Sequence, residues 1–263
     1  ILNKFYELFT QINNIEQLPS TKPLLAHYTT ISVLEKIIEH EEVWFSNPLF
    51  MNDLEEVRFG IHRGISILEE QKGLDEACGS SYRSSLLKMS FYQFYERFDQ
   101  QSALDTYVFC LSQHEQADHD GVLSMWRGYG GQGNGAAIVF NTQALEMHED
   151  SPFIIAKVRY GSEQQRKDIL KQNIEEWRSL INKLSLADDK LWLAAHALLE
   201  MLKGIALTSK HIGFREEREW RVIYMADRDP NEVLKPNLHY HIGPRGVEPK
   251  LKLKISPDLV APG

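Results

Sequence analysis

Two hydrophobic patterns occur along the chain, and together they predict a mixed fold. Short apolar or alternating runs predict strands at Leu24–Tyr28, Val43–Phe45, Tyr107–Ser112, Ala136–Phe140, Phe153–Arg159, Glu219–Met225 and Lys250–Ile255. Apolar residues repeated every three or four positions predict helices near 1–14, 32–38, 54–68, 86–98, 170–184 and 191–207. Strands and helices do not alternate regularly, which disfavours a doubly wound parallel sheet.

The same pattern predicts one α+β domain over residues 1–263. Core strands are expected near 24–46, 107–160 and 217–255. Two helical blocks, 53–98 and 163–207, interrupt these strands and look like insertions into a sheet-based core. The sequence contains no internal repeat, low-complexity tract or long Pro/Gly linker that would separate domains.

Composition narrows the class of protein. No apolar run approaches the ~20 residues that span a bilayer, and the amphipathic N-terminus lacks the features of a signal peptide. We therefore expect a cytoplasmic protein with no membrane partner. Of the two cysteines, Cys110 lies in an apolar run and is expected to be a buried thiol. The formal charge of −8 argues against general binding to nucleic-acid duplexes.

The first segment with chemical potential is His27-Tyr28-Thr29, at the end of a predicted strand. A histidine in that position can point into a cleft and exchange a proton near neutral pH. Ser32 and Glu35 have capping-box spacing, and the helix that they begin would offer free N–H groups to an anion. The alternative interpretation is a histidine that is hydrogen-bonded within the core.

The second segment is Ser124-Met125-Trp126-Arg127-Gly128-Tyr129-Gly130-Gly131, within a region that has five glycines between 128 and 135. Arginine binds phosphate, glycine lets the backbone approach a ligand, and Trp or Tyr can cover a ring. The spacing matches neither a Walker motif nor a dinucleotide fingerprint. A flexible hairpin loop with one buried tryptophan is the alternative.

The third segment runs from Gly213 to Val222 and places charged residues directly before a strand. Alternate residues of a strand share a face, so Glu217, Glu219 and Arg221 are expected to point to the same side. Two carboxylates beside an arginine would then form a hydrogen-bonding pair in a cleft. The alternative is a solvated, ion-paired edge that contributes little to stability.

The fourth segment is a polar loop with side chains that are able to bind metal: His114, Glu115, Asp118, His119 and Asp120. Neither this loop nor the pair His239 and His241 has zinc or calcium spacing. A metal-dependent hydrolase that uses the loop residues is nevertheless kept as an alternative. The sequence shows no nucleophile elbow and no activating context for either cysteine.

The ordered motifs resemble a bacterial family known as domain of unknown function twenty-nine seventy-one. They are His27-Tyr28-Thr29, Ser46-Asn47-Pro48, Met51-Asn52-Asp53, Ser124-x-Trp126-Arg127-Gly128-Tyr129-Gly130 and Phe214-x-Glu216-Glu217-Arg218-Glu219-Trp220-Arg221. The motifs extend over roughly residues 24–225. The family implies no established activity.

The His27 region is also similar to the first motif of ADP-ribosyltransferases of the His-Tyr-Glu type. That similarity implies a split β-sheet core and NAD as substrate, with His27 on the adenosine-side ribose. Tyr129, or alternatively Tyr28, would pack on nicotinamide. Glu219 would bind the nicotinamide ribose, with Glu217 completing a Glu-x-Glu arrangement. Arg127 would neutralise the pyrophosphate, and Trp126 would pack beneath the loop.

The implied function is an NAD-dependent ADP-ribosyltransferase or NAD glycohydrolase, with a role as a toxin or phage-defence effector. A fixed carboxylate would stabilise the oxocarbenium-like centre that forms when the nicotinamide–ribose bond breaks. The acceptor would be a protein, a nucleic acid or water. The alternatives are a non-catalytic module that senses a nucleotide or binds a partner protein, the metal-dependent hydrolase, and a purely structural role for the Arg–Glu pairs.

Overall fold

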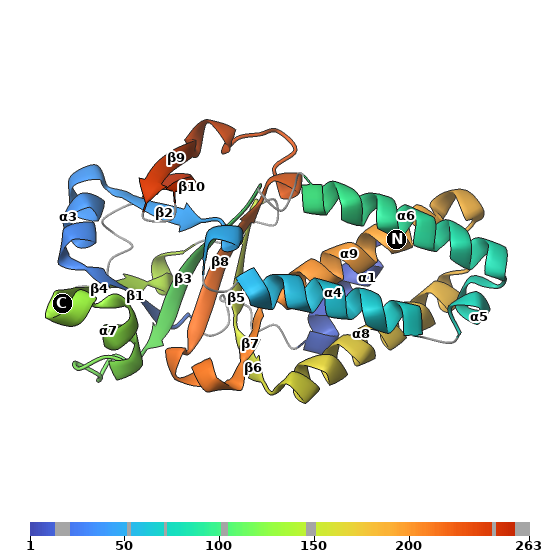
Figure 1. Cartoon of the computed structure of the whole chain (residues 1–263), viewed down its shortest axis with the longest axis horizontal. Coiled ribbons are helices and arrows are strands. Elements are labelled where there is room, and N and C mark those ends of the chain that lie inside the picture. The colour runs from blue at the N-terminus through green and yellow to red at the C-terminus, as the bar shows by residue number, and fades with distance from the viewer. Residues whose placement is uncertain are drawn as a thin grey trace. The chain divides into compact units, whose positions relative to one another are not determined.

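The computed structural model describes residues 1–13, 22–51, 54–70, 73–100, 105–145, 151–243 and 246–255. Asn52 and Asp53, of the motif Met51-Asn52-Asp53, lie outside these residues. The chain forms two compact units, and Figure 1 labels the helices and strands of both. The helical unit takes residues 1–15, 53–103 and 161–211, and the sheet unit takes residues 16–52, 104–160 and 212–263.

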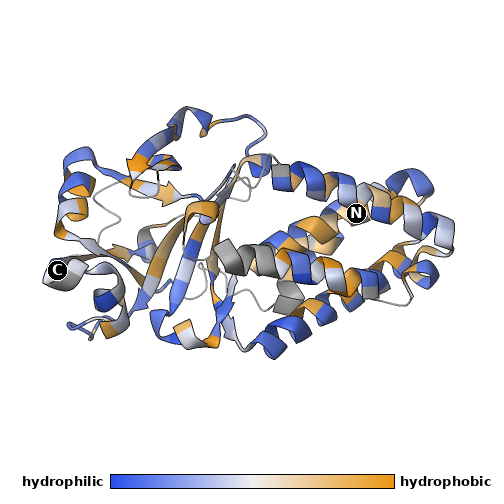
Figure 2. Ribbon diagram, in the orientation of Figure 1, coloured by the Kyte–Doolittle hydropathy of each residue, from blue (hydrophilic) through white to orange (hydrophobic). Residues whose placement is uncertain are grey.

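In its described residues, the helical unit contains six helices. They are α1 (Leu2–Asn13), α4 (Leu54–Glu70), α5 (Leu74–Cys78), α6 (Ser81–Gln100), α8 (Glu163–Leu184) and α9 (Leu191–Leu207), with a 3₁₀ turn, η5 (Asp188–Lys190), before the last. Helix α9 contacts α1, α4, α6 and α8. It is apolar around most of its circumference, as its largely orange ribbon in Figure 2 shows. A helix with this composition must be buried, so α9 is the centre of the unit.

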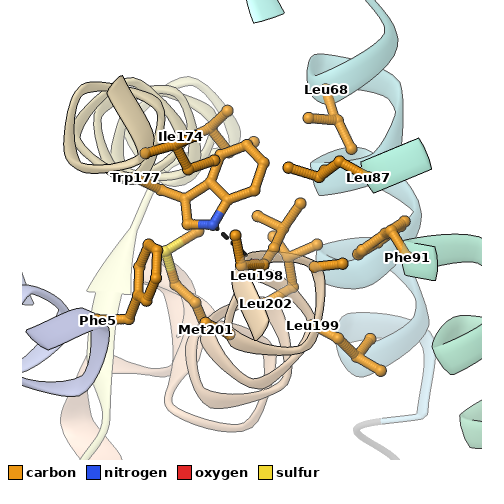
Figure 3. Close-up of a cluster of buried hydrophobic side chains, with 14 of the residues drawn as sticks. Phe5, Leu68, Leu87, Phe91, Ile174, Trp177, Leu198, Leu199, Met201 and Leu202 are labelled. Atoms are coloured by element: carbon orange, nitrogen blue, oxygen red, sulfur yellow. Dashed lines mark hydrogen bonds between the residues drawn. The ribbon is translucent and has the colours of Figure 1, made fainter. Parts of the chain in front are cut away.

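Trp177 of α8 anchors the helical core (Figure 3). It is 1% exposed, and its indole Nε1 donates to the carbonyl oxygen of Ala194, 3.0 Å away on α9. Phe5, Leu87, Phe91 and Leu198 belong to the same buried cluster. The indole therefore buries a large apolar surface without leaving its one donor unsatisfied.

Two glycines let α4 approach α9 closely. A Cβ atom at Gly60 would lie 2.9 Å from the Cβ atom of Ala206, and one at Gly64 would collide with the side chain of Leu202. Gly204 of α9 has a similar relation to the ring of Phe9. Small residues at these positions therefore set the distance between the helices.

The sheet unit contains one antiparallel sheet of eight strands. They are β1 (Leu24–Thr30), β2 (Glu42–Ser46), β3 (Thr106–His114), β4 (Gly135–Asn141), β5 (Phe153–Lys157), β8 (Glu219–Met225), β9 (Leu238–Gly243) and β10 (Gly246–Lys254). The order along the main path is β4-β1-β3-β2-β10-β9, with β8 on the other edge of β3 and β5 beyond it. Strands β6 (Arg159–Gly161) and β7 (Ser209–His211) lie where the chain passes between the units.

Strand β3 is the centre of this sheet, and one of its edges forks. β8 pairs with β3 along residues 106–112. On the opposite edge, β1 pairs only with residues 112–114 and β2 only at Val108. The β1–β4 ribbon and the β2–β10–β9 ribbon therefore diverge from the same edge of β3, with the segment 109–111 between them.

Short helices and turns connect the strands. They are α3 (Ile31–His40), η1 (Pro48–Phe50), α7 (Leu123–Tyr129), η3 (Gly131–Gly133), η4 (Thr142–Ala144), η6 (Ile212–Glu217), η7 (Ala226–Arg228) and η8 (Lys235–Asn237). The side chain of Asn47 accepts from Leu49 N–H and begins η1, and this asparagine is fully buried. The Ser-Asn-Pro motif therefore fixes the exit of β2.

Most predicted elements are confirmed, and the mixed class without a doubly wound parallel sheet is confirmed. The predicted bounds of α9 and β8 match the structure. Strand β9 was not predicted, and the hairpin loop considered for Trp126–Tyr129 is wrong, because this segment is helix α7. Among the described residues, no helix combines the length and the apolar character that crossing a bilayer requires.

Candidate functional site

His27 lies at the fork of the sheet and points to its core face. Its Nδ1 atom is 3.1 Å from the carbonyl oxygen of Cys110, in the β3 segment that has neither ribbon beside it. The imidazole stacks on Phe109 with 4.5 Å between ring centroids. Burial lowers the pKa of His27, and the contact with Cys110 opposes that shift only in part.

This geometry fits the interpretation of His27 as a hydrogen-bonded core histidine. Phe109 continues the stack to Phe45, at 5.4 Å, and meets Phe140 edge-on at 6.1 Å. The histidine ring fills the fork with an aromatic surface, and Nδ1–H donates to the carbonyl oxygen of Cys110. Cys110 itself is only partly buried, so the expected buried thiol at this position is wrong.

Tyr28 points to the opposite face of β1 and holds Trp126. Its hydroxyl accepts from the N–H of Val122, at 2.9 Å, and its ring meets Trp126 edge-on with centroids 4.7 Å apart. The Trp126 indole donates to the carbonyl oxygen of Asp120, at 2.7 Å. Tyr28 and Trp126 therefore join the His27-Tyr28-Thr29 segment to the segment that begins at Ser124.

The turn before α7 explains one glycine in this region. Gly121 has φ +70°, and a Cβ atom on it would lie 2.6 Å from the Tyr28 hydroxyl. The Asp118 carboxylate accepts from the N–H groups of Asp120 and Gly121, and the bond from Gly121 is the main cause of its lowered pKa. The metal-binding interpretation of this loop overlooked the spacing of Asp118 and Gly121, which predicts such a turn.

Thr29 and Thr30 both have structural roles. Thr29 is buried on the same face of β1 as His27, opposite Ala136 of β4. Thr30 is the N-cap of α3, and its hydroxyl accepts from the N–H of Val33. The capping box predicted at Ser32 and Glu35 is therefore wrong, because β1 runs directly into a helix that begins two residues earlier.

Arg127 and Tyr129 lie on the exposed surface of α7. Tyr129 is 49% exposed and is the last residue of the helix. Arg127 is exposed and follows Trp126 by one position, about 100° around the helix, so it lies outside the side that packs on Tyr28. The helix therefore packs its partly buried tryptophan on Tyr28 and leaves Arg127 and Tyr129 exposed.

The expected alternation of Glu217, Glu219 and Arg221 holds for only two of these residues. Glu217 ends the 3₁₀ turn η6, and Arg218 has φ +44°, so the strand begins at Glu219. Arg221 then donates from Nε to Oε1 of Glu219, at 2.8 Å, and from a terminal nitrogen to Oε2, at 3.1 Å. Both side chains are at least 94% buried, so the pair is a buried ion pair and not a solvated edge.

Register places His27 and Glu219 on opposite faces of the sheet. Glu219 is opposite Ser112, and Ser112 is opposite Ala26, so these three residues share the face that also carries Tyr28. His27 is on the other face with Trp220 and Phe109. The structure therefore brings Tyr28 together with Trp126 but does not gather His27, Tyr129 and Glu219 around one cavity.

An open hollow of about 1280 Å³ lies beside Tyr28 and Trp126. Strand β4 and helix α3 contribute to its lining, as does the loop 113–121. The loop supplies hydrogen-bonding side chains from Gln113, His114, Gln116 and His119. His27, Arg127, Tyr129, Glu217 and Glu219 are not among the lining residues.

The polar side chains of this loop do not form a metal centre in the described part of the chain. No group of three or more His, Cys, Asp or Glu residues there has the geometry to hold an ion. Asp118 is engaged in the turn, and Glu115 pairs with Arg218 at 3.5 Å. Of the other two candidates, His241 meets Trp44 edge-on at 5.1 Å, and His239 is exposed on β9. The described geometry therefore gives the metal-dependent hydrolase no support.

Comparison with known proteins finds a family similarity in part of this chain. A family model described as protein of unknown function DUF2971 matches residues 125–222. This is the same family that the sequence motifs resemble. The segment begins just before Trp126 and ends just after Arg221, so it contains one of the five motifs completely and all of another except Ser124. Searches of curated proteins and of solved structures found no match. The resemblance to DUF2971 is confirmed, and it brings no activity with it.

Proposed function

Taking the DUF2971 match as the premise, we propose that the sheet unit binds a ring-bearing small molecule of the nucleoside class in the hollow beside Tyr28 and Trp126. The observation that supports this proposal is an aromatic wall formed by the partly exposed ring of Trp126, which the buried Tyr28 (4% exposed) holds in place from behind. The Tyr28 hydroxyl and the Trp126 indole each have a backbone partner, so both rings are held before a ligand arrives. A preorganised ring surface lowers the entropic cost of stacking a ligand.

The polar lining suits the edges of a base or a ribose. Gln113, Gln116 and Asn141 offer both donors and acceptors, and His114 and His119 add imidazole nitrogens. A few directional polar groups around an aromatic wall are typical of small-molecule sites. The volume of the hollow exceeds the roughly 300–1,000 Å³ of common ligand pockets, so a nucleoside would fill part of it.

The charges of the lining favour a neutral or cationic ring. Among the lining residues, Glu41, Glu115 and Asp118 are carboxylates, and Lys22 is the cation. A pyrophosphate would meet more negative than positive charge inside the hollow. The pyridinium ring of NAD is cationic, so we propose its nicotinamide–ribose half as the ligand, with the pyrophosphate outside and toward the exposed Arg127 on α7.

A thermal-shift experiment tests this binding. Nicotinamide riboside, adenosine, NAD and ADP-ribose are added separately to the full chain, to His119→Ala and to the control His239→Ala. Both histidines are exposed, but only His119 lines the hollow. We expect nicotinamide riboside and NAD to raise the melting temperature of the wild type and of the control, and to raise that of His119→Ala less. The absence of a shift with all four compounds would overturn the proposal.

Cleavage of NAD is the second candidate, and the shared face of Tyr28 and Glu219 favours it. A ring bound at Tyr28 would lie on the same side of the sheet as this carboxylate. Glu219 would have to exchange its ion pair with Arg221 for the ribose, because both carboxylate oxygens accept from that guanidinium. Transfer to a protein, a nucleic acid or water would follow the ADP-ribosyltransferase scheme.

Release of nicotinamide separates the two candidates. The wild type, Glu219→Gln and His239→Ala are incubated with NAD, and free nicotinamide is measured by chromatography below the melting temperature of the least stable variant. Binding alone predicts a melting shift without release. Release by the wild type and the control, but not by folded Glu219→Gln, would replace the binding proposal with an enzymatic one.

A further inference from the structure

Strand β4 has one edge that no other described strand covers. It ends the strand order of the sheet and pairs with β1 along residues 135–141. Ile31 N–H donates to the carbonyl oxygen of Asn134, which lies directly opposite. In an antiparallel ladder hydrogen-bonded pairs alternate with non-bonded ones, so Asn134, Ala136, Ile138 and Phe140 direct their N–H and C=O groups toward β1. The intervening residues Gly135, Ala137, Val139 and Asn141 therefore point their N–H and C=O groups away from β1.

The hollow surrounds this edge. Ala137 and Val139 line it from the face of Tyr28, while their neighbour Ile138 lines it from the face that packs on α3. Successive residues of a strand point to opposite faces, so a hollow that reaches all three includes the edge itself. The hollow thus leaves room for an additional strand beside the outward N–H and C=O groups of Ala137 and Val139.

The two sides of the edge differ in chemistry. On the side of α3 the lining is mainly apolar, from Leu34, Ile37 and Ile38, with the carboxylate of Glu41 at the end of the helix, and Ile38 is 66% exposed. On the side of Tyr28 the loop contributes the carboxylates of Glu115 and Asp118. An extended segment along β4 would place alternate side chains against an isoleucine-rich surface and an acidic one.

We propose that a partner protein adds an extended segment to β4, with apolar residues alternating with lysine or arginine. Backbone hydrogen bonds to Ala137 and Val139 would supply affinity, and the two unlike sides of the edge would supply specificity. An uncovered strand edge with an adjacent apolar surface is a template for such pairing. This inference is independent of the proposed ligand, because it depends on the backbone of β4 and not on the aromatic wall.

A basic segment fits better than a second copy of this chain. The β4 sequence, Gly-Ala-Ala-Ile-Val-Phe-Asn, contains no cation. Two β4 edges paired with each other would therefore place no positive charge from these strands against Glu115 and Asp118. The formal charge of −8 also opposes association between copies.

Fluorescence polarisation with a labelled peptide of alternating lysine and valine, seven residues long, tests the proposal. Val139→Pro removes one outward N–H without removing a bond to β1, and Val139→Thr keeps that N–H and the shape of the side chain. We expect Val139→Pro to weaken binding at least tenfold and Val139→Thr to bind like the wild type. A peptide with glutamate in place of lysine, and one N-methylated along one edge, should each bind at least tenfold more weakly.

The circular-dichroism spectrum and melting temperature of each variant show whether its fold is kept, and Ala137→Pro repeats the test at the second outward position. Equal binding by a folded Val139→Pro or Ala137→Pro variant and the wild type would overturn the proposal. So would the absence of binding by the wild type. A wild-type dimer that either proline variant dissociates, seen by sedimentation, would assign the edge to a second copy instead.

Discussion

The Nδ1 atom of His27 lies 3.1 Å from the carbonyl oxygen of Cys110, where β1 separates from β3. The residue with the most obvious catalytic potential in the sequence thus completes the hydrogen bonding of a diverging sheet. Its partner is a backbone atom, so the contact does not depend on the side chain at position 110.

His27→Phe should destabilise the protein and change its pH dependence. The variant keeps an aromatic ring against Phe109 but leaves the Cys110 carbonyl without this donor, at a cost of about 1–3 kcal/mol. Burial holds the pKa of His27 below its ordinary value of 6.5, so the unfolded chain binds a proton more readily than the folded one. This contribution is fully present above pH 6.5 and is lost as pH falls from 6.5 through the lower folded pKa.

Urea unfolding between pH 5 and pH 8 measures both effects. The wild type and the exposed-site control His239→Ala should share the loss of stability below pH 6.5, whereas His27→Phe should lack the His27 component. If His27→Phe follows the wild-type pH profile, the imidazole is not buried in its neutral form.

The buried pair of Glu219 and Arg221 should behave as a unit. Glu219→Gln leaves a buried guanidinium without its counter-charge and should cost about 3–5 kcal/mol. In the double variant Glu219→Gln/Arg221→Met the unpaired charge is gone, so we expect part of that stability to return. Chemical denaturation of the wild type, both single variants and the double variant completes the cycle. Strictly additive losses would mean that the two side chains act independently.

Gly60 and Gly128 form a matched pair of helical glycines. A Cβ at Gly60 would lie 2.9 Å from Ala206, whereas a Cβ at Gly128 would have no neighbour within 4 Å. Gly60→Ala should therefore destabilise the helical unit by about 1–3 kcal/mol, since overpacking outweighs the gain in helix propensity. Gly128→Ala should stabilise the protein slightly, by about 0.5–1 kcal/mol. Thermal unfolding checks both, and an equal gain from the two variants would contradict the close approach of α4 and α9.

Gly121→Ala should disturb the wall of the hollow. The new Cβ would lie 2.6 Å from the Tyr28 hydroxyl, at a residue with φ +70°, and strain of this kind costs about 1–3 kcal/mol. Displacement of Tyr28 should also weaken the melting shift with nicotinamide riboside. Gly133→Ala is the control, because Gly133 also has positive φ but no neighbour within 4 Å of the added atom. A full ligand-induced shift in Gly121→Ala would show that the ligand does not use this wall.

Periodicity alone was enough to predict the long elements. The bounds of α9 and β8 follow from their apolar patterns, because each is buried on most sides and its neighbours impose no irregularity. Position-specific backbone geometry was harder to predict. Arg218 adopts φ +44° between the end of η6 at Glu217 and the start of the strand at Glu219, so the predicted alternation from Glu217 failed.

The candidate site was harder to predict because it depends on contacts between distant segments. Nothing in His27-Tyr28-Thr29 reveals which of its side chains faces the core, since histidine and tyrosine are both compatible with either face. The fork of β3 decides this, through pairing with residues more than eighty positions away. The edge of β4 that no other described strand covers is equally invisible in its sequence, which has the apolar composition of a central strand.

The interleaving of the two units has a consequence for any attempt to divide the protein. The chain contributes three stretches to each unit in turn, so neither unit corresponds to a single contiguous piece. One cut anywhere between residues 16 and 211 removes part of both hydrophobic cores. Within each core, contacting segments are separated in the sequence by a whole stretch of the other unit. This separation raises the contact order, which slows folding. A version that retains one unit would have to be spliced from three fragments with new linkers.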